Sequence, residues 1–313
     1  MKKIFLLIGL SFVTSIAVAN DTASKKNPFL VVLGIAQDAG YPQMGCKKSC
    51  CLAAWKNPKL KRFATSLALV DPAEKKWWLF EATPDIKDQL ELFQRITSSS
   101  YSFLPEGIFI THAHMGHYTG LVQLGREVMN ASSIPVCVMP RMKEFLTTSG
   151  PWSLLVEMKN ITLVEMKDDS SFAISRQLSV SPFLVPHRDE FSETAGFSIQ
   201  SKNKKVVFIP DIDKWEKFEK NMDSLVHQSF ITFLDGTFYK DGEVGGRPMS
   251  EIPHPFITES VKRFGSLPAA DKRKIFFIHF NHTNPLLDAG STEHRNTSAT
   301  FNISEQGTII MLN

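Results

Sequence analysis

Hydrophobic and polar positions alternate along the chain with two periods. Short apolar runs rich in β-branched and aromatic residues, bounded by Gly, Pro, Asn or Asp, predict strands. Stretches with apolar residues three and four positions apart predict helices. The predicted strands cover residues 29–36, 66–70, 77–81, 107–111, 134–139, 178–185, 196–200, 206–209, 230–234, 275–279 and 308–312. The predicted helices cover residues 84–96, 117–129, 141–148, 214–227 and 255–264, the first with Thr83 as its cap and Pro84 in its first turn.

The predicted strands come first as hairpins and then alternate with helices, in two rough halves. Periodicity alone supports an α/β or α+β fold, and it is compatible with two sheets packed face to face with helices outside. No Pro-, Ser- or Gly-rich linker and no internal repeat divides the middle of the chain. We therefore expect residues 29–313 to form a single domain.

The first nineteen residues are typical of a targeting segment. Lys2 and Lys3 precede a mostly apolar run over residues 4–16, and Ala17-Val18-Ala19 gives a small-x-small cleavage site before Asn20. The apolar run is short for a transmembrane span. We expect a signal peptide over residues 1–19, cut after Ala19, and a polar leader over residues 20–28. The protein would then be periplasmic or secreted, without stable membrane insertion after cleavage, and an uncleaved anchor is the alternative.

Composition indicates an ordinary globular protein. Hydrophobic residues make up 43% of the 313-residue chain, which is enough for a sizeable core. The formal net charge is +3, and we expect the basic residues to be scattered over the surface. Nothing therefore indicates a nucleic-acid partner. A small-molecule substrate is the expected partner, and the sequence does not address the oligomeric state.

Three histidines lie close together between a predicted strand and a predicted helix. His112, His114 and His117 fall within six residues, directly after the apolar run 107–110. Neutral imidazole is the commonest protein ligand for transition metals, and α/β folds place their sites at such strand ends. The cluster therefore predicts a metal site, against the alternative of a surface group of titrating histidines.

Three cysteines form a second cluster, in a loop of Gly, Lys and Ser. Cys46, Cys50 and Cys51 are compatible with a structural zinc site, and a disulfide or free thiols are the alternatives. Neighbouring cysteines such as Cys50 and Cys51 bridge each other only with strain. Cys137 lies inside an apolar strand and is expected in the core.

Further ligand types stand at the ends of later predicted strands. His187, Asp211 and His279 each end an apolar run, and His282 follows three residues after the last. Taken singly, a histidine at a strand end is more often structural. The ordered set after three clustered histidines is a much more specific indication of a metal centre.

The motif His-x-His-x-x-His followed by Thr119-Gly120-Leu121 resembles the signature of the metallo-β-lactamase superfamily, His-x-His-x-Asp-His. The resemblance implies a four-layer αββα sandwich. It implies a first metal on His112, His114 and His187, a bridging Asp211, and a second metal on His117 and His279. Gly116 stands where the family has an Asp. We therefore expect one tightly bound and one weakly bound or absent metal, with a Gly116→Asp variant gaining affinity for the second.

The loop from Gly40 to Cys51 resembles the cysteine loop of the pyrroloquinoline quinone biosynthesis protein B family. The cyclic phosphodiesterase of phosphonate degradation has a similar loop, in which cysteines and a C-terminal His bind a structural zinc. The resemblance implies that Cys46, Cys50, Cys51 and His282 form such a site here, although Lys48 occupies the usual middle Cys position. The resemblance to the two families runs from about Val31 to Leu287.

The resemblance implies a metal-dependent hydrolase acting on an ester, phosphodiester, lactone or lactam through zinc-activated water, and the predicted signal peptide implies that it is exported. Asp211 would orient the water, and His254 would act as general acid or bind substrate, unless it is a loop His packed against the sheet. Asp85 and Asp235 are expected to orient ligands or to be structural. An iron-dependent oxygenase and a non-catalytic metal- or ligand-binding protein are the alternatives.

Overall fold

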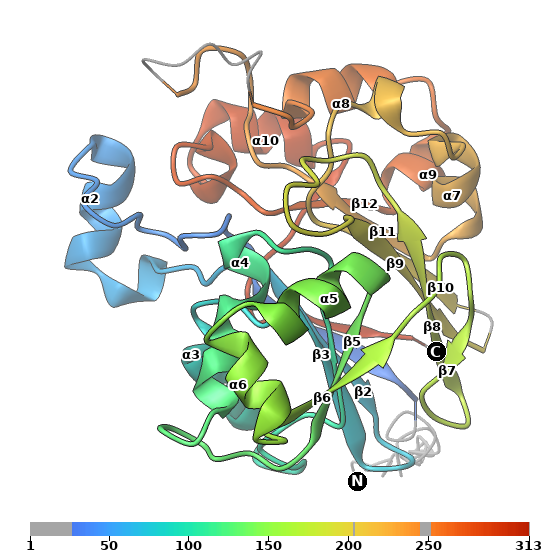
Figure 1. Cartoon of the computed structure of the whole chain (residues 1–313). Coiled ribbons are helices and arrows are strands. Elements are labelled where there is room, and N and C mark those ends of the chain that lie inside the picture. Colours follow the sequence, from blue (N-terminus) through green and yellow to red (C-terminus); the bar gives the residue numbers. More distant parts are fainter. Residues whose placement is uncertain (1–26, 203, 245–251, 313) are drawn as a thin grey trace, which may run out of the picture.

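The computed structural model describes residues 27–202, 204–244 and 252–312 (Figure 1). Its first sheet has seven strands in the order β14-β1-β2-β3-β4-β5-β6. The strands are β1 (Phe29–Gly34), β2 (Ser66–Asp71), β3 (Lys76–Phe80), β4 (Ile108–Phe109), β5 (Ile134–Val138), β6 (Ile161–Glu165) and β14 (Ile309–Met311). In this order, neighbouring strands from β14 to β3 pair antiparallel, and neighbouring strands from β3 to β6 pair parallel.

The second sheet also has seven strands, in the order β13-β12-β11-β10-β9-β8-β7. They are β7 (Phe172–Ala173), β8 (Leu178–Leu184), β9 (Ala195–Ser201), β10 (Lys204–Ile209), β11 (Ile231–Asp235), β12 (Ile275–Ile278) and β13 (Asn302–Ile303). The strands from β10 to β13 are parallel, so their carboxyl ends meet at one edge of the sheet. Parallel strands of this kind place polar side chains of successive loops side by side.

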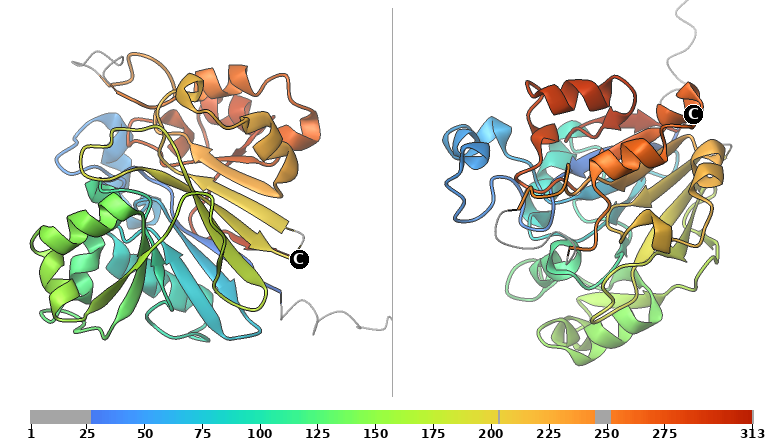
Figure 2. Two further views of the ribbon diagram at one scale, coloured as in Figure 1. Left: turned by 45° about the vertical axis from the view of Figure 1, so that its right-hand side comes forward. Right: turned by 90° about the horizontal axis from the view of Figure 1, so that it is seen from above.

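Helices cover the outer face of each sheet, which gives four layers (Figure 2). On the first sheet lie α3 (Ile86–Ile96), α4 (Met115–Tyr118), α5 (Pro140–Thr148) and α6 (Trp152–Glu157); on the second lie α7 (Met222–Gln228), α8 (Ile257–Arg263), α9 (Ala269–Lys272) and α10 (Thr292–Ser298). One apolar core, with Phe80, Phe197 and Phe208, joins the two sheets, and a second core joins the first sheet to its helices. The αββα sandwich that the resemblance implied is therefore confirmed.

Every predicted strand is present to within a few residues, but several helix predictions were wrong in extent. The helix expected over residues 117–129 is instead the short α4 followed by the 3-10 turn η2 (Thr119–Leu124). The helix expected over residues 214–227 is η3 (Trp215–Lys217) and α7. Thr83 does not cap α3, which begins at Ile86. The Thr83 hydroxyl instead accepts a hydrogen bond from the Asp85 N–H and donates one to Gln89.

Two small helices in the cysteine region were not predicted, α2 (Ser49–Lys56) and η1 (Pro58–Leu60). The predicted signal peptide and most of the leader lie outside the described residues. Among the residues that the structure describes, none of the helices has the length and apolar character needed to cross a bilayer.

Candidate metal centre

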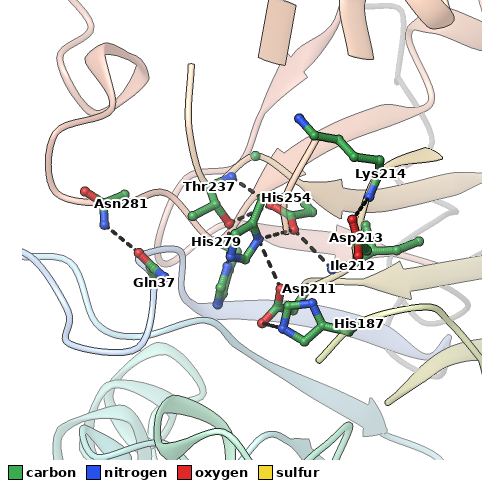
Figure 3. Close-up of polar contacts among 12 residues, drawn as sticks. Gln37, His187, Asp211, Ile212, Asp213, Lys214, Thr237, His254, His279 and Asn281 are labelled. Carbon is green, nitrogen blue, oxygen red and sulfur yellow. Dashed lines mark hydrogen bonds and ion pairs between the residues drawn. The ribbon is translucent and has the colours of Figure 1, made fainter. Parts of the chain in front are cut away.

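The predicted ligands follow the carboxyl ends of strands in both sheets. His112 and His114 lie in the loop after β4, and His187, Asp211 and His279 follow β8, β10 and β12. The sheet edges face each other here, so that loops far apart in sequence meet at one place (Figure 3).

One group of ligand atoms belongs to His112, His114, His187 and Asp211, and these atoms all lie within 4.8 Å of one another. Asp211 Oδ2 lies 3.3 Å from both His112 Nε2 and His187 Nε2. The same oxygen lies 4.0 Å from His114 Nδ1. Three imidazoles and a carboxylate that converge in this way match the donor set of zinc sites.

A second group consists of Asp38, His117 and His279, again with ligand atoms within 4.8 Å of one another. Asp38 Oδ1 lies 3.3 Å from His117 Nε2 and 3.8 Å from His279 Nε2. Asp211 Oδ2 lies 3.7 Å from His117 Nε2, so this carboxylate borders both groups. Asp38 was missed from sequence, although it follows the first predicted strand by two residues, where a strand-end carboxylate could have been noticed.

Asp38 corrects the expectation about Gly116. A Cβ on Gly116 would lie 2.1 Å from Asp38 Oδ1 and 2.3 Å from Asp38 Cα, closer than any real contact. The carboxylate that the family motif supplies from the Gly116 position thus comes here from the loop after β1. The expectation that the second group lacks an acidic member was wrong, and Gly116 is the residue that leaves room for Asp38.

Backbone hydrogen bonds fix the Asp38 loop beside the end of β12. The Gln37 N–H donates to the Phe280 carbonyl, and the Phe280 N–H donates to the Ile35 carbonyl, each at 2.8 Å. The Asn281 side-chain amide donates to Gln37 Oε1 (Figure 3). His279 itself has a left-handed backbone with φ of 69°, an uncommon conformation for a residue other than glycine. Such outliers are typical of functional sites.

Two threonines hold the outer nitrogens of ligand-type histidines. Thr111 Oγ1 lies 2.9 Å from His112 Nδ1, and Thr237 Oγ1 lies 2.9 Å from His279 Nδ1. Both contacts leave Nε2 turned toward the centre. A hydrogen bond to the second ring nitrogen is the usual way in which proteins orient a metal-binding imidazole.

Two carboxylates contact the outer ring nitrogens of two further histidines, His114 and His117. Glu190 Oε2 lies 3.0 Å from His114 Nε2, which directs Nδ1 of this ring inward. Glu81, fully buried, lies 3.4 Å from His117 Nδ1. Sequence analysis did not single out Glu81, Glu190, Thr111 or Thr237, because their roles depend on contacts across the fold.

The inward-facing atoms fit a metal. His112 Nε2, His117 Nε2, His279 Nε2, Asp38 Oδ1 and Asp211 Oδ1 are buried without a hydrogen-bond partner among the described residues. Buried polar atoms without partners are costly, and such a cluster is explained by ions that they would bind. Burial and the neighbouring His117 hold the pKa of His112 well below its usual value, so this ring is neutral, which is the metal-binding form.

His254 is buried beside the centre. Its Nδ1 lies 2.8 Å from Asp235 Oδ2 and 3.1 Å from Asp211 Oδ1 (Figure 3). Burial disfavours the imidazolium, but Asp235 and Asp211 together raise the pKa of His254 to about 10. Asp235 is itself fixed by hydrogen bonds from Ile212 N–H and Thr237 N–H. His254 therefore lies between two carboxylates and among the residues that line the cleft, where a proton donor could act.

The remaining predicted residues are a separate group of candidate metal ligands and two residues with contacts inside the fold. Asp85 accepts a hydrogen bond from Ala64 N–H and has a structural role. The structure brings together Cys46, Cys50, Cys51 and His282, whose ligand atoms lie within 4.8 Å of one another. His282 Nδ1 is 3.3 Å from Cys51 Sγ. Cys137 is buried in β5, as expected.

A cleft of about 540 Å³ opens above the centre. Its walls include Gln37, Asp38, Gln43, Met115, Arg188, Phe238, Val244, Ile252, His254, Asn281 and His282. The cleft can hold a small molecule, and His254 and Asp38 are among the residues that line it.

Comparison with known proteins gives a family and several relatives. The family model described as a beta-lactamase superfamily domain matches residues 76–280. The coenzyme PQQ synthesis protein B of Methylococcus capsulatus is 26% identical over 295 residues, covering 85% of this chain and 94% of the relative. The protein of the same description from Rhizobium meliloti is 24% identical, covering 90% and 97%.

Two solved structures share the fold. Zinc-bound PqqB from Methylobacterium extorquens superimposes with a TM-score of 0.76 at 21% identity, covering 90% of this chain and 99% of its own. A diphosphatase from the PhnP family gives 0.65 at 18% identity, covering 91% and 97%. At these identities the likeness establishes the architecture, and any shared chemistry has to be argued from the residues of the site.

Proposed function

This chain belongs to the metallo-β-lactamase superfamily, and from that premise we propose that it is a metal-dependent hydrolase with a two-metal centre. The proposed ligands are His112, His114 and His187 for one ion and Asp38, His117 and His279 for the other, with Asp211 between them. Zinc is the proposed metal, supported by the imidazole-rich donor set and by the zinc-bound PqqB relative.

The position of Asp211 carries this proposal. One oxygen of this buried carboxylate faces His112, His187 and His117 at 3.3, 3.3 and 3.7 Å, and thus reaches both ligand groups. A carboxylate shared by two groups is the arrangement that two-metal hydrolytic sites need. Zinc held there would supply Lewis acidity, lowering the pKa of water and polarising a substrate oxygen.

The protein residues would position the reactants and move the proton. The other oxygen of Asp211 lies 3.1 Å from His254 Nδ1, an ion-pair contact that would help to hold the carboxylate beside an attacking water. His254 lines the cleft with its Nδ1 facing Asp235 and Asp211, so the proton on its other ring nitrogen, Nε2, would be the one donated to the leaving group. The apolar cleft wall, with Phe238, Val244 and Ile252, would exclude bulk water from the reacting atoms.

The proposed substrate is a small ester, phosphodiester, lactone or lactam. Among these, a phosphodiester or diphosphate is the first choice to test, because two adjacent metal sites suit in-line displacement at phosphorus. The diphosphatase of the PhnP family, which shares the fold, supports the same choice. We also propose that the enzyme acts in the periplasm or outside the cell, as the N-terminal segment predicts.

An iron-dependent oxygenase is the second candidate function. The observation that favours it is the similarity to coenzyme PQQ synthesis protein B over most of the chain. The complete set of ligands for two ions favours the hydrolase, since a single redox iron would leave half of these ligands unused. The metal that the purified protein contains separates the two candidates. A non-catalytic binding protein remains a third candidate, distinguished by the absence of turnover.

The experiment is metal analysis of the purified chain together with turnover of bis(p-nitrophenyl) phosphate and a panel of lactones and lactams. The wild-type protein is compared with a His112→Ala/His114→Ala variant and with His227→Ala as a matched control. The side chain of His227 is 75% exposed and belongs to none of the ligand groups among the described residues. We expect the double variant to lose zinc and turnover and the control to retain both. Equal zinc content in all three proteins, or turnover supported by iron and oxygen alone, would overturn the hydrolase proposal.

A further inference from the structure

The segment 40–62 forms a small cap that stands out from the rest of the molecule. It contains the cysteine loop, α2 and η1, and Figures 1 and 2 show it at the side of the sandwich. Between positions 41 and 61 just three residues are buried, namely Pro42, Cys51 and Ala54. Nearly all of its side chains therefore face solvent.

The charge of the cap is of one sign. From residue 39 to residue 70 the chain contains no Asp or Glu but six cationic residues. These are Lys47, Lys48, Lys56, Lys59, Lys61 and Arg62. The five lysines are exposed, and within the described residues none has a carboxylate at ion-pair distance. The expectation that basic residues are scattered was wrong for this segment.

Large apolar side chains are exposed among these lysines. Met44 is 87% exposed, Trp55 48% and Leu52 43%. Leu52 and Trp55 lie about one turn apart on α2, next to the buried residues Cys51 and Ala54. Trp55 is held in place by a hydrogen bond from its indole N–H to the Cys46 carbonyl. An ordered tryptophan beside lysines, left in water, is unusual for a free surface.

We propose that the cap is a docking surface for an anionic lipid bilayer. In this arrangement Trp55 and Leu52 enter the interfacial region and the lysines contact the headgroups. Apolar and aromatic residues on one face with surrounding lysines are the signature of interfacial binding. Because Gly40, Gln43 and His282 belong both to the base of the cap and to the wall of the cleft, docking would place the cleft mouth next to the bilayer.

The apolar residues favour a bilayer over another polyanion. A nucleic acid would require cations, but it would leave Leu52 and Met44 exposed and without function. An acidic protein partner would need a matching apolar pocket, whereas a bilayer accepts these side chains without one. The two contributions can be separated experimentally, because salt weakens the contacts of the lysines and has little effect on the burial of Leu52.

The test is binding of the zinc-loaded chain starting at Asn20 to phosphatidylglycerol/phosphatidylcholine vesicles, by co-sedimentation. This chain lacks the apolar N-terminal run, which could bind vesicles by itself, and retains every residue that the structure describes. The cap variant carries Lys→Gln at four sites, Lys47, Lys48, Lys56 and Lys59. The matched control carries the same four changes at exposed lysines elsewhere, Lys75, Lys167, Lys202 and Lys262. A third variant, Leu52→Gln, removes an apolar side chain and no charge.

We expect the cap variant to bind at least about tenfold more weakly than the control, and Leu52→Gln to bind several-fold more weakly than wild type. Tryptophan fluorescence should shift to the blue on binding, because Trp55 is the most exposed tryptophan. Equal affinities of the cap and control variants would overturn the proposal. So would binding of duplex RNA as tight as that of vesicles together with an unaffected Leu52→Gln variant, which would indicate a general polyanion site.

Discussion

The molecule has two candidate metal sites that are built in opposite ways. The ligands of the central site stand at strand ends of both sheets, and the outer ring nitrogens of four of its histidines are fixed by Thr111, Glu81, Glu190 or Thr237. The cysteine site takes three ligands from one exposed segment, with His282 as the single ligand from the sandwich. We therefore expect the sandwich to hold the central ligands whether or not metal is bound, and the cap to depend on a metal.

This difference concerns where the stabilising free energy comes from. The central ligands lie next to two large apolar cores, so the geometry is preformed. The cap has almost no core of its own, and a structural zinc can contribute about 10–16 kcal/mol of binding-coupled folding free energy. We propose zinc at Cys46, Cys50, Cys51 and His282 for this reason. The predictions below test the contrast in order of expected effect.

The largest effect is expected for Asp211→Asn. The substitution retains size but removes the charge that faces both ligand groups, so affinity for both central ions should fall. Hydrolysis of bis(p-nitrophenyl) phosphate should drop by roughly a thousandfold or more, since metal-ion stabilisation accounts for several kcal/mol of the barrier. Circular dichroism should be unchanged, because the ligands are held by the sheets. An activity within tenfold of wild type would contradict the bridging role.

A large but local effect is expected for Cys51→Ser. It should release the zinc of the cap and leave the central zinc in place, and trypsin should cut between residues 47 and 62 roughly a hundredfold faster. Ser49→Ala on the same helix is the control, because Ser49 is exposed and outside the ligand cluster. Loss of the central zinc together with the cap zinc would show that the two sites are not independent.

A moderate effect is expected for Gly116→Asp. The new side chain must displace Asp38, so the second group should bind zinc about tenfold to a hundredfold more weakly, contrary to a gain in affinity. The double variant Asp38→Gly/Gly116→Asp moves the carboxylate to the family position and should recover part of this loss. Calorimetric zinc titration of the three proteins measures the effect. Tighter binding by the single variant would contradict the proposed role of Asp38.

A smaller effect is expected for Glu190→Gln. This residue is partly exposed and contacts His114 through its outer nitrogen, so the ring keeps a hydrogen-bond partner but loses a charged one. Affinity of the first group for zinc should fall by about tenfold. Glu193→Gln in the same loop is a control, because it contacts Arg141 N–H and none of the proposed ligands. An equal decrease in both variants would indicate a loop effect alone.

The smallest effect concerns thiol chemistry at pH 8. Burial raises the pKa of Cys137 to about 12, so this thiol stays protonated and should resist alkylation in the folded protein. After chelation, Cys46 should react first: desolvation by burial raises the pKa of this thiol, but hydrogen bonds from the Lys48 backbone, Cys51 and Cys50 together outweigh it and lower the pKa. Mass spectrometry of iodoacetamide-treated protein gives the order. Early labelling of Cys137 would show that the first sheet opens.

The sequence predicted the sandwich well because its strands are long apolar runs with clear boundaries. It also located His112, His114, His187 and Asp211, which stand at strand ends. It missed Asp38, because the motif shows only that Gly116 lacks the carboxylate of the family Asp. The packing of the loop after β1 against this glycine is needed to show that Asp38 supplies a carboxylate at the same place. It missed Glu190 for a similar reason, because the contact with His114 spans 76 residues.

The hydrogen bond between Gln37 and Asn281, which are 244 residues apart, has a consequence for the order in which the metal sites form during folding. The first ligand group is complete in sequence once β10 and Asp211 have been synthesised, whereas the second awaits β12 and His279 near the C-terminus. The cap also waits for His282. The second group and the cap therefore form only after the segment that follows β12 has packed against the loop that follows β1. Binding of zinc at these two places is thus expected to wait until the two distant segments have joined.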